Sequence, residues 1–71
     1  MEEKMRKLAT EIKVLRAKKN MTQEELANAS GVSVCAITFI EGCKKRPRVA
    51  TLVKIAKALE VDEKELLKFI D

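Results

Sequence analysis

Basic side chains are the residues of this sequence whose grouping points most clearly to a chemistry. Lys and Arg number 15 and Asp and Glu number 11, which gives a formal charge of only +4. Ten of the 15 cations nevertheless lie in two segments that hold no acid, residues 12–23 and 42–59. One such segment is ordinarily a solvated face. Two of them around a short central segment are better explained by contacts with nucleic-acid phosphates.

Catalytic and metal chemistry finds little support in the residue types. The chain has no histidine, no pair of nucleophile and base and no glycine-rich phosphate loop, so we expect that it is not an enzyme. Cys35 and Cys43 stand eight residues apart, and two thiols without a histidine cannot fill a four-ligand zinc site. We therefore expect no metal and no other cofactor. Both thiols are interpreted as small apolar side chains that a cytosolic compartment keeps reduced, with oxidation-sensitive binding at Cys35 as the alternative.

Residues 22–41 have the residue types of two short helices joined by a tight turn. Thr22, followed three residues later by Glu25, forms a capping box that begins a helix. Gly31 falls where the chain must bend sharply and a positive φ costs least, and Ser33 caps the second helix. The small and apolar positions that follow Gln23 at offsets of four, eight, fourteen and seventeen are Ala27, Gly31, Ile37 and Ile40. This joint spacing predicts a helix-turn-helix that reads DNA.

The elements that would position these residues are five helices and no strand. Apolar residues at three- and four-residue spacing predict the first helix, and caps, turns and Pro47 delimit the others. The expected ranges are about 3–18, 23–30, 34–41 and 49–59, followed by a fifth helix capped by Asp62. A chain of 71 residues has room for one core, so we expect a single all-α domain over residues 1–71. The absence of an apolar membrane-spanning run or a signal-peptide pattern in the sequence predicts a cytoplasmic protein.

The sequence resembles the Cro and phage-repressor family of small DNA-binding domains, also called XRE-like regulators. The resemblance runs from about Leu8 to Phe69 and rests on the segments I-K-V-L-R-A-K-K-N-M-T-Q-E-E-L-A, G-V-S, the I-E that ends the third helix, and L-V-K-I-A-K-A-L. The basic run from Lys45 to Arg48 is most similar to the repressors of lambdoid phages. The resemblance implies a five-helix lambda-repressor-like fold with the helix-turn-helix at its second and third helices. It further implies a transcriptional repressor that binds an inverted-repeat operator in double-stranded DNA as a homodimer, in association with the nucleoid.

Base reading is expected from the outward positions of the third helix, about residues 34–41, in the major groove. The residues at these positions are Val34, Cys35, Thr38 and Phe39. They offer one hydroxyl and three apolar groups where family members usually carry amides or arginines. Apolar groups read the thymine methyl, so we expect A·T-rich half-sites. The alternative for Phe39 is that it packs on a partner protein or on the following loop.

Two groups of residues are expected to hold the DNA backbone. The N-terminus of the second helix presents free amides to a phosphate, and Gln23 adds a side-chain donor there, as in similar repressors. In the loop after the third helix, Lys44, Lys45 and Arg46 are expected on phosphates. The resemblance places Arg48 in a narrow A·T-rich minor groove, where the negative potential is focused. The alternatives are that Gln23 is only a favourable first-turn residue and that the loop is only solvated basic surface.

The resemblance also implies a largely buried ion pair between Arg16 and Glu41, which joins the first helix to the end of the third. Such a bidentate pair orients the two helices more than it stabilises them, because desolvation offsets much of the attraction. After Glu41 the sequence departs from the family. Gly42 precedes Cys43 where a polar residue followed by glycine is usual. Glu60 stands where glycine normally takes a left-handed conformation, at a cost of about 1 kcal/mol if that conformation is kept.

Dimerisation is also favoured by the weak base reading of a single module, because two half-sites one helical turn apart multiply a modest specificity. The last helix offers more apolar groups than so short a terminus can bury: Leu66, Leu67, Phe69 and Ile70. We expect no membrane partner and no small-molecule effector. The competing hypothesis is a protein-interaction module, antitoxin-like or anti-repressor, that uses the apolar face of the third helix. Salt-sensitive DNA binding separates the two hypotheses.

Overall fold

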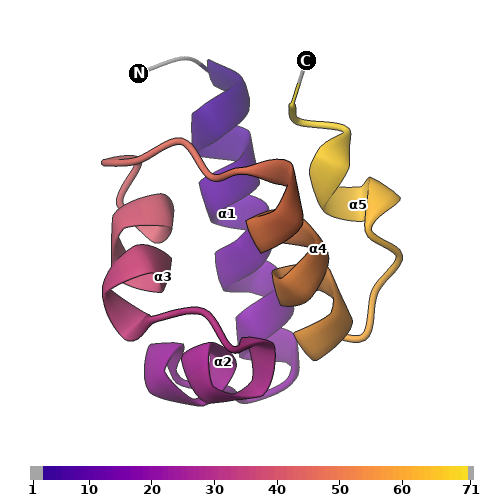
Figure 1. Ribbon diagram of the computed structural model, residues 1–71. Helices are drawn as coiled ribbons and strands as arrows, with labels where there is room; N and C mark the ends of the chain where they lie inside the picture. Colours follow the sequence, from indigo (N-terminus) through magenta and orange to yellow (C-terminus); the bar gives the residue numbers. More distant parts are fainter. Residues whose placement is uncertain (1–2, 71) are drawn as a thin grey trace.

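The computed structural model describes residues 3–70, and over that range it contains five helices and no strand (Figure 1). The helices are α1 (Glu3–Lys18), α2 (Gln23–Ser30), α3 (Val34–Glu41), α4 (Val49–Ala58) and α5 (Lys64–Leu67). The all-α prediction is therefore confirmed, and α4 ends one residue earlier than expected. The ends of the predicted domain, residues 1–2 and 71, lie outside the described residues. No helix of the described range is long and apolar enough to cross a membrane.

One hydrophobic core joins all five helices. Its fully buried large side chains come from every helix: Leu8, Ile12, Leu26, Ile37, Leu52, Ile55 and Leu66. Figure 1 shows α3 on one side of the molecule and α5 on the other, with α1 and α4 between them. Burying an aliphatic side chain of this size contributes about 1.5–3 kcal/mol. Helices as short as α2 and α3, with eight residues each, are therefore held by packing and not by helix propensity.

Side-chain caps and one glycine fix the turn between α2 and α3. Thr22 Oγ1 accepts a hydrogen bond from the Glu25 N–H at 3.0 Å, and Glu25 Oε1 accepts one from the Thr22 N–H at 2.8 Å. Gly31 ends α2 with a φ of 75°, and an added Cβ would meet no atom within 4 Å, so backbone conformation alone selects glycine there. Ser33 Oγ accepts from the Ala36 N–H at 3.1 Å and begins α3. The predicted capping box, turn and cap are confirmed.

Three other helix ends use a left-handed residue that is not glycine: Asn20 after α1, Cys43 after α3 and Glu60 after α4. At each end the N–H of the next residue donates to the carbonyl five positions back, which satisfies the last turn of the helix. Cys43 has a φ of 58° while Gly42 has a φ of −91°, so the glycine of this sequence does not occupy the position that favours it. Glu60 keeps the left-handed conformation in which glycine is usual at this position, and a hydrogen bond from Lys19 lowers the pKa of its carboxyl group.

The single turn of α5 closes the core on the side away from α3. Asp62 Oδ1 accepts a hydrogen bond from the Lys64 N–H at 2.9 Å, which caps this turn. Leu66 is fully buried, so it is not available to a partner chain, and the expectation that it lies in a dimer interface is corrected. The physical reason is that α5 packs on both α1 and α4 and closes the apolar core on that side. Leu67, Phe69 and Ile70 pack against the same core but remain partly exposed.

Candidate nucleic-acid interface

α3 turns one face to the core and the other to solvent. Ile37 and Ile40 are buried, with 1% and 4% of their surface exposed. The residues predicted to read bases are all exposed: Val34, Cys35, Thr38 and Phe39. Phe39 keeps 45% of its surface exposed, so the following loop does not cover it. The outer face of α3 is therefore available to a partner along its whole length.

An ion pair fixes the end of α3 against α1. Arg16 Nε lies 2.9 Å from Glu41 Oε2, and Arg16 Nη2 lies 3.0 Å from Glu41 Oε1, which is a bidentate contact. Arg16 Nη1 also donates to the carbonyl oxygen of Met21 at 2.8 Å. The side chain of Glu41 is only 3% exposed, and its hydrogen bonds with Arg16 raise the pKa of the guanidinium. These contacts hold α1, the connection to α2 and the end of α3 in one arrangement.

Gln23 extends this network from Glu41 to the surface. Gln23 Nε2 donates to Glu41 Oε1 at 3.1 Å, and Gln23 Oε1 accepts from Thr38 Oγ1 at 2.9 Å. The amide oxygen and one N–H of Gln23 are thus used within the protein, which leaves its second N–H for a phosphate. The sequence analysis did not predict this link between Gln23 and Thr38. The sign of it in the sequence is that these two polar residues stand on the two helices of the helix-turn-helix.

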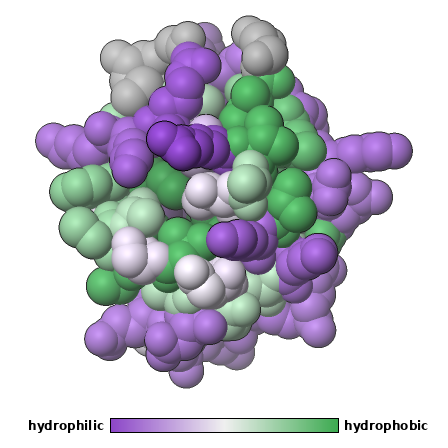
Figure 2. Space-filling view, viewed as in Figure 1, coloured by the Kyte–Doolittle hydropathy of each residue, from purple (hydrophilic) through white to green (hydrophobic). Residues whose placement is uncertain are grey.

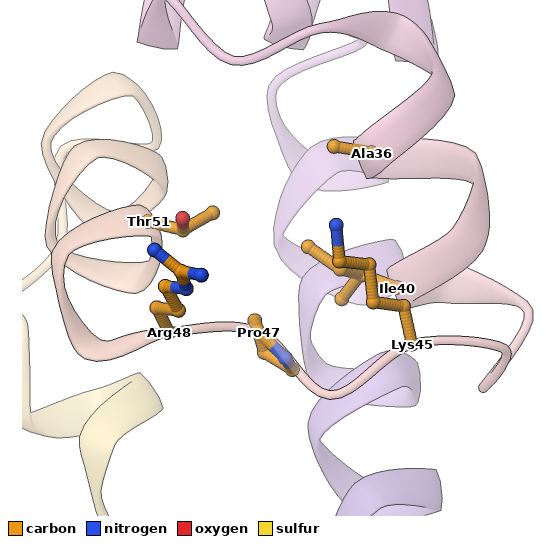
Figure 3. A pocket seen from close by; sticks show the side chains of 6 residues that line it. All are labelled: Ala36, Ile40, Lys45, Pro47, Arg48 and Thr51. Carbon is orange, nitrogen blue, oxygen red and sulfur yellow. The ribbon is translucent and has the colours of Figure 1, made fainter.

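A hollow of about 240 Å³ lies between α3, the following loop and the start of α4 (Figure 3). Its lining residues are Ala36, Ile40, Lys45, Pro47, Arg48 and Thr51. Figure 3 shows the side chains of Lys45 and Arg48 rising on opposite sides of the hollow, with the Thr51 hydroxyl beside Arg48. Pro47 is buried, so the middle of the basic loop is held to the protein. The sequence analysis used Pro47 only as a residue that delimits the helices, because a proline among charged residues gives no sign of burial.

The cations predicted to hold DNA lie in the loop that follows α3, and two of them, Lys45 and Arg48, line this hollow. Lys44, Lys45, Arg46 and Arg48 are all exposed. Arg48 is also the N-cap residue of α4 and makes no side-chain cap hydrogen bond, so the first turn of α4 keeps backbone N–H groups without that partner. Cations together with such amides are the groups that bind phosphate oxygens in protein–DNA interfaces.

Apolar side chains are exposed at two places on the face drawn in Figure 2, over α3 and where α4 and α5 meet. On α3 the large exposed side chains are those of Val34 and Phe39. Near α5 the partly exposed side chains are those of Leu67, Phe69 and Ile70. These two surfaces lie on different sides of the molecule, so one of them can contact a second chain while the other contacts DNA.

The two cysteines are free and do not meet a metal-ligand set. Cys35 is exposed, and Cys43 is partly buried with its Sγ 3.9 Å from the carbonyl oxygen of Met5. Within residues 3–70, no group of three or more His, Cys, Asp and Glu side chains is placed to hold a metal ion. The chemistry that this face offers is binding, through cations, hydrogen-bonding groups and apolar contacts.

Comparisons with known proteins agree on one family. The helix-turn-helix family HTH_3 matches residues 12–66. An uncharacterized helix-turn-helix-type transcriptional regulator of Archaeoglobus fulgidus is 40% identical over 62 residues, which cover 87% of this chain and 87% of that protein. The helix-turn-helix-type transcriptional repressor RghR of Bacillus subtilis is 34% identical over 64 residues, which cover 89% of this chain and 47% of RghR.

Solved structures give the same result for the fold. The wild-type restriction-modification controller protein C.Esp1396I superposes with a TM-score of 0.87 at 30% identity, over 97% of this chain and 88% of that chain. An HTH_3-family transcriptional regulator from Vibrio cholerae superposes with a TM-score of 0.83 at 30% identity, over 90% of this chain and 36% of that chain. The resemblance to the Cro and phage-repressor family is thereby confirmed. The chain belongs to the helix-turn-helix family of DNA-binding transcriptional regulators, which are not enzymes.

Proposed function

We propose that the protein is a repressor that binds an inverted-repeat operator in double-stranded DNA as a homodimer. The observation that carries this proposal is the placement of α3. Its inner face is anchored by Ile37 and Ile40, its outer face is exposed, and exposed cations lie beside it. A rigid helix with a free face next to phosphate-binding groups is the arrangement that reads a major groove. The proposal takes residues 1–71 as one cytoplasmic, nucleoid-associated domain and needs no small-molecule effector.

In this proposal α3 lies in the major groove with its apolar side chains on base edges. Val34, Cys35 and Phe39 contact thymine methyl groups, and the hydroxyl of Thr38 makes the polar contact. Apolar contacts discriminate weakly, so much of the specificity comes from DNA shape and from the pairing of two half-sites. The expected half-sites are rich in A·T pairs.

The DNA backbone is held on both sides of α3. Near the N-terminus of α2, the remaining amide N–H of Gln23 donates to a phosphate. On the other side, Lys44, Lys45 and Arg46 lie on phosphates and Arg48 reaches the minor groove. Support comes from the hollow between α3 and α4, because two cations face each other across it (Figure 3). Such contacts position the protein without reading sequence.

The proposed dimer surface is formed by Leu67, Phe69 and Ile70. These side chains are only partly buried by their own chain. They belong to the end of α5 and the chain after it, which lie on the side of the molecule away from α3 (Figure 1). A partner that covers them leaves both copies of α3 free to enter successive major grooves. The similarity to the repressor RghR supports the repressor part of the proposal.

The test is a selection from random duplexes of about thirty base pairs, long enough for two half-sites one helical turn apart. The purified protein is incubated with the pool at near-physiological salt, and the bound duplexes are sequenced. Enrichment of an A·T-rich inverted repeat is the expected result. Enrichment of a single half-site contradicts the homodimer, and binding without any enrichment contradicts sequence-specific reading.

A second candidate function is a protein-interaction module that uses the same face of α3. The observation that favours it is the exposure of two large apolar side chains, Val34 at 41% and Phe39 at 45%, at positions that face DNA in the first proposal. The exposed cations beside α3 argue against this second function, because the apolar surface of a protein partner offers no negative groups to pair with them. Failure of the protein to bind any duplex in the selection is the result that favours this candidate.

A further inference from the structure

A line of hydrogen bonds runs from the buried carboxylate of Glu41, through the amide of Gln23, to the hydroxyl of Thr38 on the outer face of α3. We propose that this line fixes the Thr38 hydroxyl as an acceptor, so that Thr38 selects a base that donates a hydrogen bond in the major groove. The inference rests on the proposed binding of DNA through α3, and it names the base chemistry recognised at one position of that helix.

Glu41 can only accept hydrogen bonds in this arrangement. Arg16 donates to both of its carboxylate oxygens, at 2.9 and 3.0 Å. A carboxylate held in this way by a guanidinium acts as an acceptor. An ionised carboxylate has lone pairs and no hydrogen to offer. Any neighbour within hydrogen-bond distance of Glu41 must therefore be a donor.

The Glu41 carboxylate fixes the orientation of the Gln23 amide. Its nitrogen lies 3.1 Å from Glu41 Oε1 and must face the carboxylate, since the amide oxygen would be repelled there. The amide is planar, so its oxygen faces the other way. That oxygen lies 2.9 Å from Thr38 Oγ1 and can only accept.

The Thr38 hydroxyl has a single hydrogen to donate. Because Gln23 Oε1 accepts, Thr38 must donate that hydrogen to it. The hydroxyl oxygen keeps two lone pairs and has no further hydrogen for DNA. Thr38 is exposed, so these lone pairs are open to a base edge.

The acceptor character limits which bases Thr38 can recognise. In the major groove, the donors are the N6 amino group of adenine and the N4 amino group of cytosine. Guanine N7 and O6 and thymine O4 are acceptors. An acceptor opposite the Thr38 oxygen would leave both atoms without a hydrogen-bond donor. Of the two donors, adenine fits better. Its partner thymine carries a methyl group, and the exposed Val34 lies one helical turn before Thr38.

The test repeats the duplex selection with three variants beside the wild-type protein. Thr38→Val removes the hydroxyl and keeps the shape, Thr38→Ser keeps the hydroxyl, and Gln23→Leu removes the group that holds it. We expect a position at which the wild type and Thr38→Ser prefer adenine or cytosine on the strand that faces α3. Thr38→Val should lose that preference and bind the selected duplex about three- to tenfold more weakly, the effect of one hydrogen bond.

Gln23→Leu is the decisive variant, because it frees the Thr38 hydroxyl to rotate and donate. We expect it to accept guanine or thymine at that position about as well as adenine or cytosine. Urea denaturation of each variant establishes that it is folded, and if Gln23→Leu does not fold, the comparison of Thr38→Val with Thr38→Ser still decides the base preference.

Several results overturn the inference. A wild-type preference for guanine or thymine at the position that Thr38→Val relaxes contradicts the acceptor role. An unchanged preference in folded Gln23→Leu contradicts control by Gln23. If Thr38→Val binds all duplexes more weakly by the same factor, Thr38 contacts the DNA backbone and not a base. In these cases an enriched operator still supports the proposed function, whereas absence of DNA binding by the wild type overturns both.

Discussion

At the scale of single residues, Glu41 connects the interior of the protein to its reading surface. It is the buried charged residue of the described chain, and it accepts hydrogen bonds from α1 through Arg16 and from α2 through Gln23. Burying such a pair contributes little net stability, because the desolvation of both charges offsets their attraction. Removal of one partner is costly all the same, since the other then remains buried without a counter-charge. The network therefore specifies the placement of α3 more than it stabilises the fold.

The first prediction concerns Glu41→Gln. We expect its free energy of unfolding to fall by about 1–3 kcal/mol, less than for a fully buried pair because Arg16 is partly exposed. Its affinity for operator DNA should fall as well, because the end of α3 loses its link to α1. Urea denaturation measures the first effect and a DNA titration the second.

The matched control is Glu65→Gln, which breaks an exposed ion pair with Lys68. Exposed pairs contribute about 0–1 kcal/mol, so this variant should unfold close to the wild type. If Glu41→Gln and the wild type have the same denaturation midpoint, the account of Glu41 is wrong.

The sequence allowed part of this site to be predicted. The Arg16–Glu41 pair was implied by family resemblance, and the exposed positions of α3 followed from helical periodicity. The bond from Gln23 to Thr38 was not predicted, because it depends on the side-chain rotamers of two residues on different helices. For the same reason, Gln23 was expected either on a phosphate or as a first-turn residue, and its two hydrogen bonds inside the protein were not predicted.

At the scale of elements, the ends of the helices decide how α3 is presented. α3 begins at a serine cap after a glycine turn and ends at a left-handed cysteine. The residue types predict the serine cap and the glycine turn. The sequence showed that glycine was displaced by one position after α3. It did not show that Cys43 would keep the left-handed conformation, since backbone bonding across the helix end sets that conformation.

The second prediction compares Gly31→Ala with Cys43→Gly. Gly31→Ala should lower the free energy of unfolding by about 1 kcal/mol through conformation alone, since the new methyl group has free space. Cys43→Gly should raise it by up to about 1 kcal/mol, because glycine adopts a positive φ without cost. Thermal and urea denaturation report both changes. Equal effects of the same sign would contradict the assignment of strain to these two positions.

The third prediction concerns the loop between α3 and α4. Lys44→Ala and Lys45→Ala should each reduce the slope of log affinity against log salt by about 0.9 per protomer, the share of one phosphate contact, and so by about 1.8 for the dimer. Their urea denaturation should match that of the wild type, since both side chains are exposed. Lys64→Ala, on α5, is the control and should leave the slope unchanged. If both loop variants keep the wild-type slope of log affinity against log salt, the loop does not contact DNA phosphates.

At the scale of the whole molecule, the fold follows from the spacing of apolar residues. The periodic runs of α1 and α4 and the caps of α2 and α3 predicted four helices closely, because each pattern is local. The last helix was the exception. The four apolar residues predicted for it could not be sorted into buried and exposed ones from the sequence, since that division depends on how α5 lies across α1 and α4. Two of them, Phe69 and Ile70, lie beyond the end of α5 at Leu67. The structure buries Leu66 completely and leaves the other three partly exposed.

The fourth prediction concerns the proposed dimer surface. Ile70→Asp places a charge on that surface and should weaken dimerisation about tenfold or more, as expected for a charge introduced at an apolar interface. Sedimentation velocity over a range of concentrations measures the change, and the variant should then bind single half-sites. Val14→Asp is the control, because Val14 is an exposed apolar residue of α1 outside the proposed surface. Dimers of undiminished stability in Ile70→Asp would place the interface elsewhere.

The most direct measurement is the affinity of the wild-type protein for its selected duplex and for a shuffled duplex of the same composition, followed as salt rises from about 50 to 200 mM. We expect a preference of about a thousandfold or more for the selected duplex, because two copies of α3 read base edges in paired half-sites and DNA shape adds to the discrimination. We also expect a steep, linear loss of log affinity with log salt for both duplexes, because the cations beside α3 release counterions from the DNA. Equal affinity for the two duplexes, or an affinity that does not change with salt, would contradict DNA reading by this protein.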